Sequence, residues 1–207
     1  MKANIRWEYV QKNTITYIEG IFMIKNREDL KFYLKKDCSS LHKSHLFIKW
    51  LTNNEEFHLI MFMKYLRYTE YYMNKKKNIW DYIPYFWNAW NYRRLKIKTG
   101  IYIMPNKVGP GFNPVHPGFI RIGEYVRIGS NCTILPMVLI GKSKPGIEIE
   151  DFTIGDNCYI SAGVTIFGPV KIGNNVTIGG GAVVTKDIPD NAIVGGVPAK
   201  IIKMKEL

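Results

Sequence analysis

The chain of 207 residues has only three cysteines and no long hydrophobic run. Because no stretch of about 18 apolar residues occurs, the sequence predicts no membrane-spanning segment. Its first 17 residues mix charged and polar side chains and lack the apolar core of a secretion signal. The three cysteines have no paired spacing, which excludes a disulfide framework. Together these absences predict a protein of the reducing cytoplasm.

Glycine is scarce in the first half of the chain, and tryptophan is missing from the second half. Only Gly20 and Gly100 of the 18 glycines lie within residues 1–100, whereas all five tryptophans do. Residues 1–100 hold 19 basic and 9 acidic residues, a net charge of +10, and the rest hold 10 and 8, a net charge of +2. This split predicts a boundary near residue 100, followed by a β-rich domain (101–207). Because Met23 begins a segment that itself looks like a protein start, we predict an N-terminal extension (1–22) ahead of an α-helical domain (23–100).

The basic first half has several possible partners. A net positive charge of this size indicates either an anionic partner or basic side chains that simply face the solvent on helices. No DNA-binding or RNA-binding module is recognisable, so nucleic acid is not predicted as a partner. Basic helices rich in aromatic residues also lie on membranes, so peripheral contact with the inner membrane face stays open.

Helical periodicity predicts three helices in the first half, over about 26–37, 55–73 and 80–98. Asn26 is the expected N-cap of the first helix, Asn53 or Asn54 caps the second, and Gly100 ends the third. In the third helix an apolar stripe is expected to pack against neighbouring elements. Its members are Ile83, Trp87, Trp90 and Leu95.

The second half is dominated by an aliphatic residue at every sixth position. The series is Ile122, Ile128, Ile134, Ile140, Ile154, Ile160, Ile166, Ile172, Ile178 and Val184. A helix repeats near 3.6 residues and a strand near 2. A period of six is typical of a parallel β-helix built from hexapeptides, with three hexads in each triangular coil.

Two details of the repeat carry further predictions. The step from Ile140 to Ile154 is two residues longer than two hexads, so residues 142–146 are expected to form a protruding loop. A small or β-branched residue follows after four positions at every aliphatic residue of the series except Ile140. Cys132 and Cys158 occupy this inward position and are predicted to be buried core thiols.

His116 is the only histidine of the repeat half, and it stands in a stretch rich in proline and glycine ahead of the first full hexad. A lone histidine is more often structural than catalytic. Here its place at the mouth of the coils favours a functional role, because neutral imidazole is a suitable general base for a hydroxyl group near pH 7. We therefore predict His116 to be catalytic.

The sequence resembles the hexapeptide-repeat acyltransferases, which have a left-handed parallel β-helix, and within them the serine acetyltransferase-like branch. That branch includes members found in bacterial polysaccharide clusters. The resemblance spans residues 23–207 and has four parts. They are the segment from Gly109 to Gly118 that contains His116, the hexads from Ile154 to Val184, the tail from Gly195 to Ile202, and the start from Met23 to Tyr33.

The resemblance implies an acetyl-CoA-dependent enzyme that forms a homotrimer, with each active site between neighbouring β-helices. Two trimers could also pair. His116 would take the proton of an acceptor hydroxyl, and a backbone N–H would stabilise the oxyanion. The coenzyme's pantetheine would lie on small residues of the later coils, and two lysines would lie near its phosphates. The positions concerned are Ser161, Ala162, Gly163, Gly179, Gly180, Lys186 and Lys200.

Three departures from serine acetyltransferases concern the acceptor. Val115 stands where the family has an Asp directly before the histidine. Tyr102 is the nearest match to the Asp that pairs with that histidine. Residues 145–150 lack the family's Arg-His pair. We therefore expect a sugar hydroxyl as the main acceptor, and serine as the alternative. Candidate carboxylates to orient His116 are Glu124, Glu148 and Glu150.

Two further functions stay open at the level of sequence. The same base could serve a sugar amine, which would make the protein an N-acetyltransferase. A β-helix can also be a structural assembly module without catalysis. A zinc site of the three-histidine kind that β-helix carbonic anhydrases have cannot be assembled from a domain with one histidine, so no metal is predicted.

Overall fold

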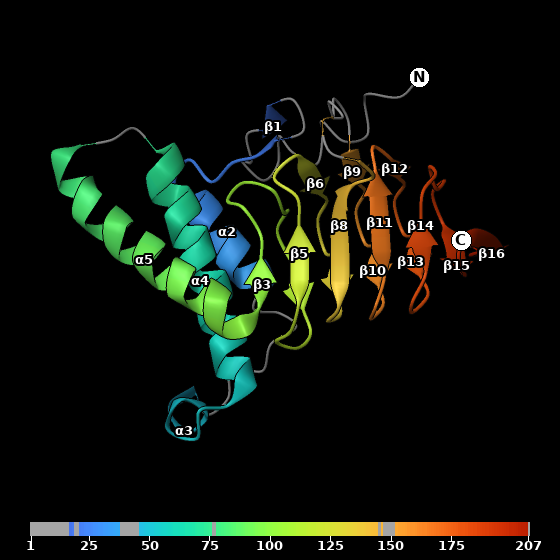
Figure 1. Ribbon diagram of the computed structural model, residues 1–207. Helices are drawn as coiled ribbons and strands as arrows, with labels where there is room; N and C mark the ends of the chain where they lie inside the picture. Colours follow the sequence, from blue (N-terminus) through green and yellow to red (C-terminus); the bar gives the residue numbers. More distant parts are fainter. Residues whose placement is uncertain are drawn as a thin grey trace.

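The computed structural model describes residues 17–18, 21–37, 46–75, 78–144, 146 and 152–206. It consists of a helical N-terminal region followed by a left-handed parallel β-helix (Figure 1). This is the predicted fold class. Most of the predicted extension 1–22 and the carboxylates Glu148 and Glu150 lie outside the described residues. The proposed division into domains stays a prediction.

The helical region contains the three predicted helices and one that the sequence did not reveal. The helices are α2 (Arg27–Asp37), α3 (Leu46–Leu51), α4 (Glu55–Asn74), the 3₁₀ turn η1 (Ile79–Asp81) and α5 (Tyr82–Thr99). Asn26 caps α2 by accepting the N–H groups of Glu28 and Asp29 at 2.8 Å each. Asn54 caps α4, and Gly100 ends α5 in the left-handed conformation (φ 73°). The missed helix, α3, has only six residues and no buried residue.

The β-helix is assembled from short strands, and successive strands along the chain belong to three different parallel sheets. Its strands are β3 (Ile101–Tyr102), β4 (Asn113–Pro114), β5 (Ile120–Ile122), β6 (Val126–Ile128), β7 (Thr133–Ile134), β8 (Val138–Lys142), β9 (Phe152–Ile154), β10 (Tyr159–Ile160), β11 (Thr165–Gly168), β12 (Lys171–Ile172), β13 (Thr177–Ile178), β14 (Val183–Val184), β15 (Ala192–Gly195) and β16 (Lys200–Met204). A separate hairpin, β1 (Tyr17–Ile18) and β2 (Ile21–Phe22), precedes the helices.

The three sheets form the three faces of a prism. The six-stranded sheet has the order β16-β15-β13-β10-β7-β4, the five-stranded sheet β14-β11-β8-β5-β3, and the three-stranded sheet β12-β9-β6. All pairings are parallel except that of β15 with β16, which closes the last coil. Because each strand hydrogen-bonds to the strand of the next coil, the polar backbone is satisfied along the whole prism.

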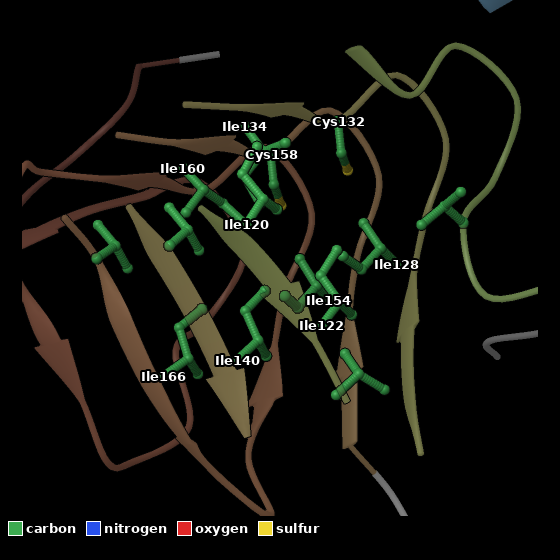
Figure 2. Close-up of a cluster of buried hydrophobic side chains, with 14 of the residues drawn as sticks. Ile120, Ile122, Ile128, Cys132, Ile134, Ile140, Ile154, Cys158, Ile160 and Ile166 are labelled. Carbon is green, nitrogen blue, oxygen red and sulfur yellow. The ribbon is translucent and has the colours of Figure 1, made fainter. Parts of the chain in front are cut away.

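The aliphatic residues of the six-residue series stack in register inside the prism. Ile122 pairs with Ile140, Ile140 with Ile166, and Ile166 with Val184. Figure 2 shows Ile122, Ile140 and Ile166 pointing into one interior, together with Cys132 and Cys158. Both thiols are 1% exposed and form no disulfide, as the sequence predicted. A hydrogen bond with Cys158, and then burial, raise the pKa of Cys132.

One prediction about the repeat requires correction. Ile140 and Ile154 lie in neighbouring faces of one coil, because Ile154 pairs with Ile128 and Ile140 with Ile122. A normal step between neighbouring faces is six residues, so the step of 14 contains an insertion of eight residues, not two. Sequence counting cannot tell one hexad with a long insertion from two hexads with a short one.

Each corner of the prism repeats in every coil, so three edges run along its length. The histidine edge joins the six-stranded to the five-stranded sheet and contains His116. The insertion edge joins the five-stranded to the three-stranded sheet and contains Glu124 and the eight-residue insertion. The asparagine edge joins the three-stranded to the six-stranded sheet. It carries left-handed asparagines with φ of 54–63°, namely Asn131, Asn157, Asn175 and Asn191.

Helices and prism share one hydrophobic core. The core continues from the prism interior to five residues of the helices, namely Leu59, Phe62, Met63, Leu66 and Tyr92. The Tyr92 hydroxyl donates to the carbonyl oxygen of Ile103 in the first coil. The helical region therefore covers the open end of the prism, where the first coil would otherwise expose its apolar interior.

The predicted packing of the apolar stripe on α5 is wrong for three of its four residues. Ile83, Trp87 and Trp90 are 63–70% exposed, whereas Leu95 packs against the core. Helical periodicity gave one apolar face, and the structure shows that α5 buries a different one. Among the described residues no helix is long and apolar enough to cross a membrane.

Candidate functional site

His116 lies on the histidine edge, in the turn between β4 and β5, and the backbone on both sides of it is tied to neighbouring segments. The N–H of Val115 donates to the carbonyl of Ile134 at 3.1 Å, and that of Gly118 donates to the carbonyl of Thr99 at 2.7 Å. The first bond fixes the turn to the next coil and the second to the end of α5. The imidazole itself is half exposed, so it can meet a substrate.

Glu55 is the described carboxylate that contacts His116. Its Oε1 lies 3.0 Å from Nδ1 of the imidazole, and the two side chains are 53% and 56% exposed. A carboxylate on Nδ1 favours the tautomer with the proton on that nitrogen, which leaves Nε2 as the acceptor. The pair therefore has the arrangement of a general base with an orienting partner.

Helix α4 delivers Glu55 to the histidine edge. Glu55 is the first residue of the helix and follows the cap Asn54. A carboxylate at this position is stabilised by the unpaired N–H groups of the first turn. The sequence analysis missed Glu55 because it lies 61 positions from His116. The candidate Glu124 lies on the insertion edge beside Lys107, so it does not contact His116 in this structure.

A buried arginine fixes the segment that leads to His116. Arg67 of α4 is fully buried, and its guanidinium donates to both Asp37 and Glu70. It also donates to the carbonyl oxygens of Val108 at 2.9 Å and Gly109 at 2.7 Å. These bonds join two helices to the first coil.

The two carboxylates of this cluster are also bonded to the first coil. Asp37 accepts the N–H of Gly111 at 2.7 Å, and Glu70 accepts the N–H of Asn106 at 2.8 Å. Burial raises the pKa of Glu70, while the charge of Arg67 opposes the shift. Burial alone would lower the pKa of Arg67, but the neighbouring carboxylates raise it. We call Arg67, Asp37 and Glu70 the buried clamp.

Most of the predicted coenzyme contacts lie on the same edge as His116. Ser161–Gly163 form the turn between β10 and β11, and Gly179–Gly181 form the next turn along the edge. The N–H of Gly181 donates to the carbonyl of Ala162, and that of Gly163 to the carbonyl of Pro136. These turns are mostly exposed and carry small side chains or none. An extended ligand such as pantetheine could therefore approach their backbone.

The two predicted lysines are divided between edges. Lys200 opens β16, directly after Ala199, whose N–H donates to the carbonyl of Val183 near the histidine edge. Lys186 follows β14 and precedes Ile188, which pairs with Ile172 of the three-stranded sheet. It therefore lies on the insertion edge, away from the other predicted contacts in one chain. Both lysines are exposed.

The arrangement can support proton transfer from a hydroxyl group to His116, beside a row of small turns along one edge. Among the described residues no group of three or more His, Cys, Asp or Glu side chains could hold a metal ion.

Two hexapeptide families match the repeat half of the chain. "Bacterial transferase hexapeptide (six repeats)" matches residues 151–186, and "Hexapeptide repeat of succinyl-transferase" matches residues 119–168. Over residues 119–186 the prism is thus similar to the hexapeptide-repeat transferases. The chain is also similar to serine acetyltransferases, as the following relatives indicate.

Curated relatives resemble about half of the chain. A serine acetyltransferase of Mycobacterium tuberculosis is 38% identical over 108 residues, which are 52% of this chain and 47% of the relative. A serine acetyltransferase of Staphylococcus aureus (strain N315) is 38% identical over 106 residues, 51% and 50% of the two chains. The chain therefore spans about half the length of the curated relatives it matches.

Solved structures resemble the fold over more of the chain. The serine acetyltransferase of Neisseria gonorrhoeae has a TM-score of 0.61 at 22% identity, and the match covers 86% of this chain and 66% of that one. A serine acetyltransferase in complex with CoA has a TM-score of 0.62 at 20% identity, with 95% and 73% covered. At this identity the likeness establishes the shared fold.

Proposed function

We propose that this protein is an acetyl-CoA-dependent O-acetyltransferase in which His116 is the general base and Glu55 orients it. The observation that carries the proposal is the contact between His116 Nδ1 and Glu55 Oε1 on the edge that also carries the small-residue turns. The named relatives support acetyl transfer, and one solved relative is a complex with CoA.

In the proposed reaction, the acceptor hydroxyl gives its proton to Nε2 of His116 as its oxygen attacks the thioester carbonyl carbon. The tetrahedral intermediate then collapses, the carbon–sulfur bond breaks, and the coenzyme leaves as a thiol after the proton returns from His116. Because the coenzyme supplies an activated acyl group, no acyl-enzyme is required. General-base assistance would contribute about 10²–10⁴-fold to the rate.

Two acceptors are supported by different observations. The names of the relatives favour serine, and one solved relative is in complex with serine. The apolar side chain of Val115, next to His116, favours a sugar hydroxyl, because it cannot pair with the ammonium group of an amino acid. The comparisons give serine the stronger support, and the sugar hydroxyl remains the second candidate.

The test is release of the CoA thiol from acetyl-CoA, with serine and a panel of free and nucleotide-linked sugars as acceptors. His116→Ala is expected to abolish acceptor-dependent release, and Glu55→Gln to lower kcat by about 10-fold or more with little change in KM for acetyl-CoA. Glu56→Gln is the matched control, since Glu56 pairs with Lys49 and not with His116. Full activity of His116→Ala would exclude the proposed mechanism.

We also propose that the chain forms a homotrimer whose active sites lie between neighbouring prisms. Exposed apolar residues on or beside the histidine edge support this, because they would be covered by another copy or by the coenzyme. They include Phe119, Met137 and Val197, which are 44–73% exposed. A trimer would also allow Lys186 of a neighbouring copy to approach the coenzyme. Light scattering after gel filtration measures the mass directly, and a monomer would contradict the proposal.

Peripheral contact with an anionic, cytoplasmic membrane face is a further part of the proposal. Trp80 of η1 and the outer face of α5, with Ile83, Trp87 and Trp90, are 63–74% exposed. Helix α5 has four basic residues and no acidic one. Such a helix can bury its aromatic face at the lipid interface while its cations meet anionic headgroups.

Cosedimentation with phosphatidylserine vesicles and with neutral phosphatidylcholine vesicles tests this contact. Binding is expected to the anionic vesicles only, and Trp87→Ser with Trp90→Ser should abolish it. A fall in oligomer mass for this double variant, with no vesicle binding by the wild type, would instead identify the face as a contact between copies and would contradict the membrane proposal.

A further inference from the structure

A cavity lies apart from the histidine edge, between the helical region and the first coil. It has a volume of about 710 Å³ and opens on the insertion edge. Thr69 and Met73 of α4 form one wall. Tyr85, Ala89, Arg93 and Lys96 of α5 form the second, and they share one helix face because they are three or four positions apart.

The third wall comes from the first coil, and it adds another cation. Lys107 lines the cavity together with Met104 and Pro105, and Glu124 is the carboxylate of the lining. The lining has a net charge of +2, because it contains three cations and one carboxylate, namely Arg93, Lys96, Lys107 and Glu124. Among the described residues, neither Lys96 nor Lys107 has a carboxylate within ion-pair distance.

The two lysines are held close to other cations. The Nζ of Lys96 lies over the ring of Tyr102, 5.4 Å from its centroid, and the guanidinium of Arg121 lies over the same ring at 5.5 Å. Burial, and then the charges of Arg121 and Arg93, lower the pKa of Lys96. Burial and the charge of Arg127 lower the pKa of Lys107, while Glu124 opposes that shift. Cations in such a place are stabilised when an anion enters.

The cavity also offers apolar surface beside this charge. Met73 and Met104 are 42% exposed each, and Tyr85 is half-buried at the lining. A free inorganic anion would leave these side chains in water, whereas an ester with an organic portion would cover them. The combination of clustered cations and an apolar wall is suited to an anion that carries an organic group.

We propose that this cavity binds an organic phosphate, with its phosphate groups between Arg93, Lys96 and Lys107 and its organic portion against Met73, Tyr85 and Met104. The cavity is separate from the histidine edge of the same chain, so it is a second site beyond the proposed acetyl transfer. A multiply charged phosphate or diphosphate matches three converging donors better than a carboxylate does.

Isothermal titration calorimetry with three probes tests the site: inorganic pyrophosphate, uridine diphosphate and geranyl diphosphate. Saturating CoA is present throughout, so that the proposed coenzyme groove is occupied. Uridine diphosphate binding would identify a soluble ester as the ligand type, and geranyl diphosphate binding a lipid phosphate; either supports the proposal. Pyrophosphate alone is expected to bind more weakly than the preferred ester.

The variants Lys96→Gln and Lys107→Gln are each expected to weaken binding of the preferred probe by about tenfold. Arg94→Gln is the matched control, because it removes one exposed charge from α5 without lining the cavity. Absence of binding by every probe, or equal weakening in Arg94→Gln, would overturn the proposal. Since the readout is binding, it is independent of whether acetyl transfer is confirmed.

Discussion

Among single residues, the buried clamp holds the segment that leads to His116. Arg67 has five bonds to two carboxylates and two carbonyl oxygens, and all of these partners are shielded from water. Such a cluster is costly to break, because removal of one partner leaves uncompensated charge in a medium that solvates it poorly. It connects the helices to the residues just before His116.

Replacing the clamp arginine tests this role. Arg67→Met is expected to lower the free energy of unfolding by about 3–5 kcal/mol, since Asp37 and Glu70 would remain buried without a counter-charge. Urea unfolding followed by circular dichroism measures the change. Arg94→Met, at an exposed position of α5, should alter stability by less than about 0.5 kcal/mol. Equal stability of the Arg67 variant and the wild type would contradict the role of the clamp.

A second prediction at this scale concerns pH. Lys96 and Lys107 have pKa values below those of unfolded lysine, so between the lowered values and about 10.4 the unfolded chain binds more protons. The free energy of unfolding contributed by these lysines therefore rises with pH across that window.

The double variant Lys96→Gln/Lys107→Gln should lack this rise and be at least as stable as the wild type at pH 7. Urea midpoints from pH 7 to 10 measure it, with Arg94→Gln as the control expected to follow the wild type. A double variant that is less stable at pH 7 would show that the lysine charges stabilise the fold instead.

Among the elements, the hexad is a strand followed by a tight turn, and close approach between coils requires glycine at some turns but not at others. A Cβ at Gly155 would lie 2.6 Å from the carbonyl oxygen of Gly173 in the next coil, and backbone cannot move aside as a flexible side chain can. A Cβ at Gly141 would meet nothing closer than the Tyr125 hydroxyl at 3.6 Å. Neither glycine has a positive φ.

These two glycines form a matched pair for mutation. Gly155→Ala is expected to destabilise the protein by roughly 1–3 kcal/mol, because the coils must separate to admit the methyl group. Gly141→Ala should be neutral within about 0.5 kcal/mol or slightly stabilising. Thermal unfolding followed by circular dichroism compares them, and similar melting temperatures for the two variants would contradict the argument from contact.

At the scale of the whole molecule, the helical region and the prism depend on each other. The same core contains Leu66 and Tyr92 of the helices and Ile103 and Val108 of the first coil. The helical region also supplies Glu55 to the histidine edge. Residues 101–207 alone would therefore lack the cover of the first coil and the carboxylate that contacts His116.

A chain reduced to residues 101–207 is therefore expected to melt at a lower temperature than the full chain and to lose activity. The physical reason is that the first coil would expose apolar surface that Leu59, Phe62 and Met63 now cover. Differential scanning calorimetry of both chains measures the stability. Retention of the full melting temperature would mean that the prism is stable without the helices.

Sequence periodicity predicted the repeat fold, three helices and the inward cysteines, because each depends on neighbours within a few positions. It predicted His116 as a site residue from local context, and that role stays a prediction. It could not predict Glu55 as the partner, since 61 positions separate the two. Nor could it show which face of α5 is buried, because both faces of the helix carry aromatic residues.

The hexad follows from the sequence, because a six-residue repeat of aliphatic residues and glycine can bury its apolar side only by coiling into a prism. The sequence also shows which turns carry small side chains. Which residues share an edge is visible in the fold alone, where Lys200 lies near the edge of His116 while Lys186 and Glu124 lie on another edge. The reason is physical: the eight-residue insertion leaves coil register open in the sequence, and strand pairing sets it.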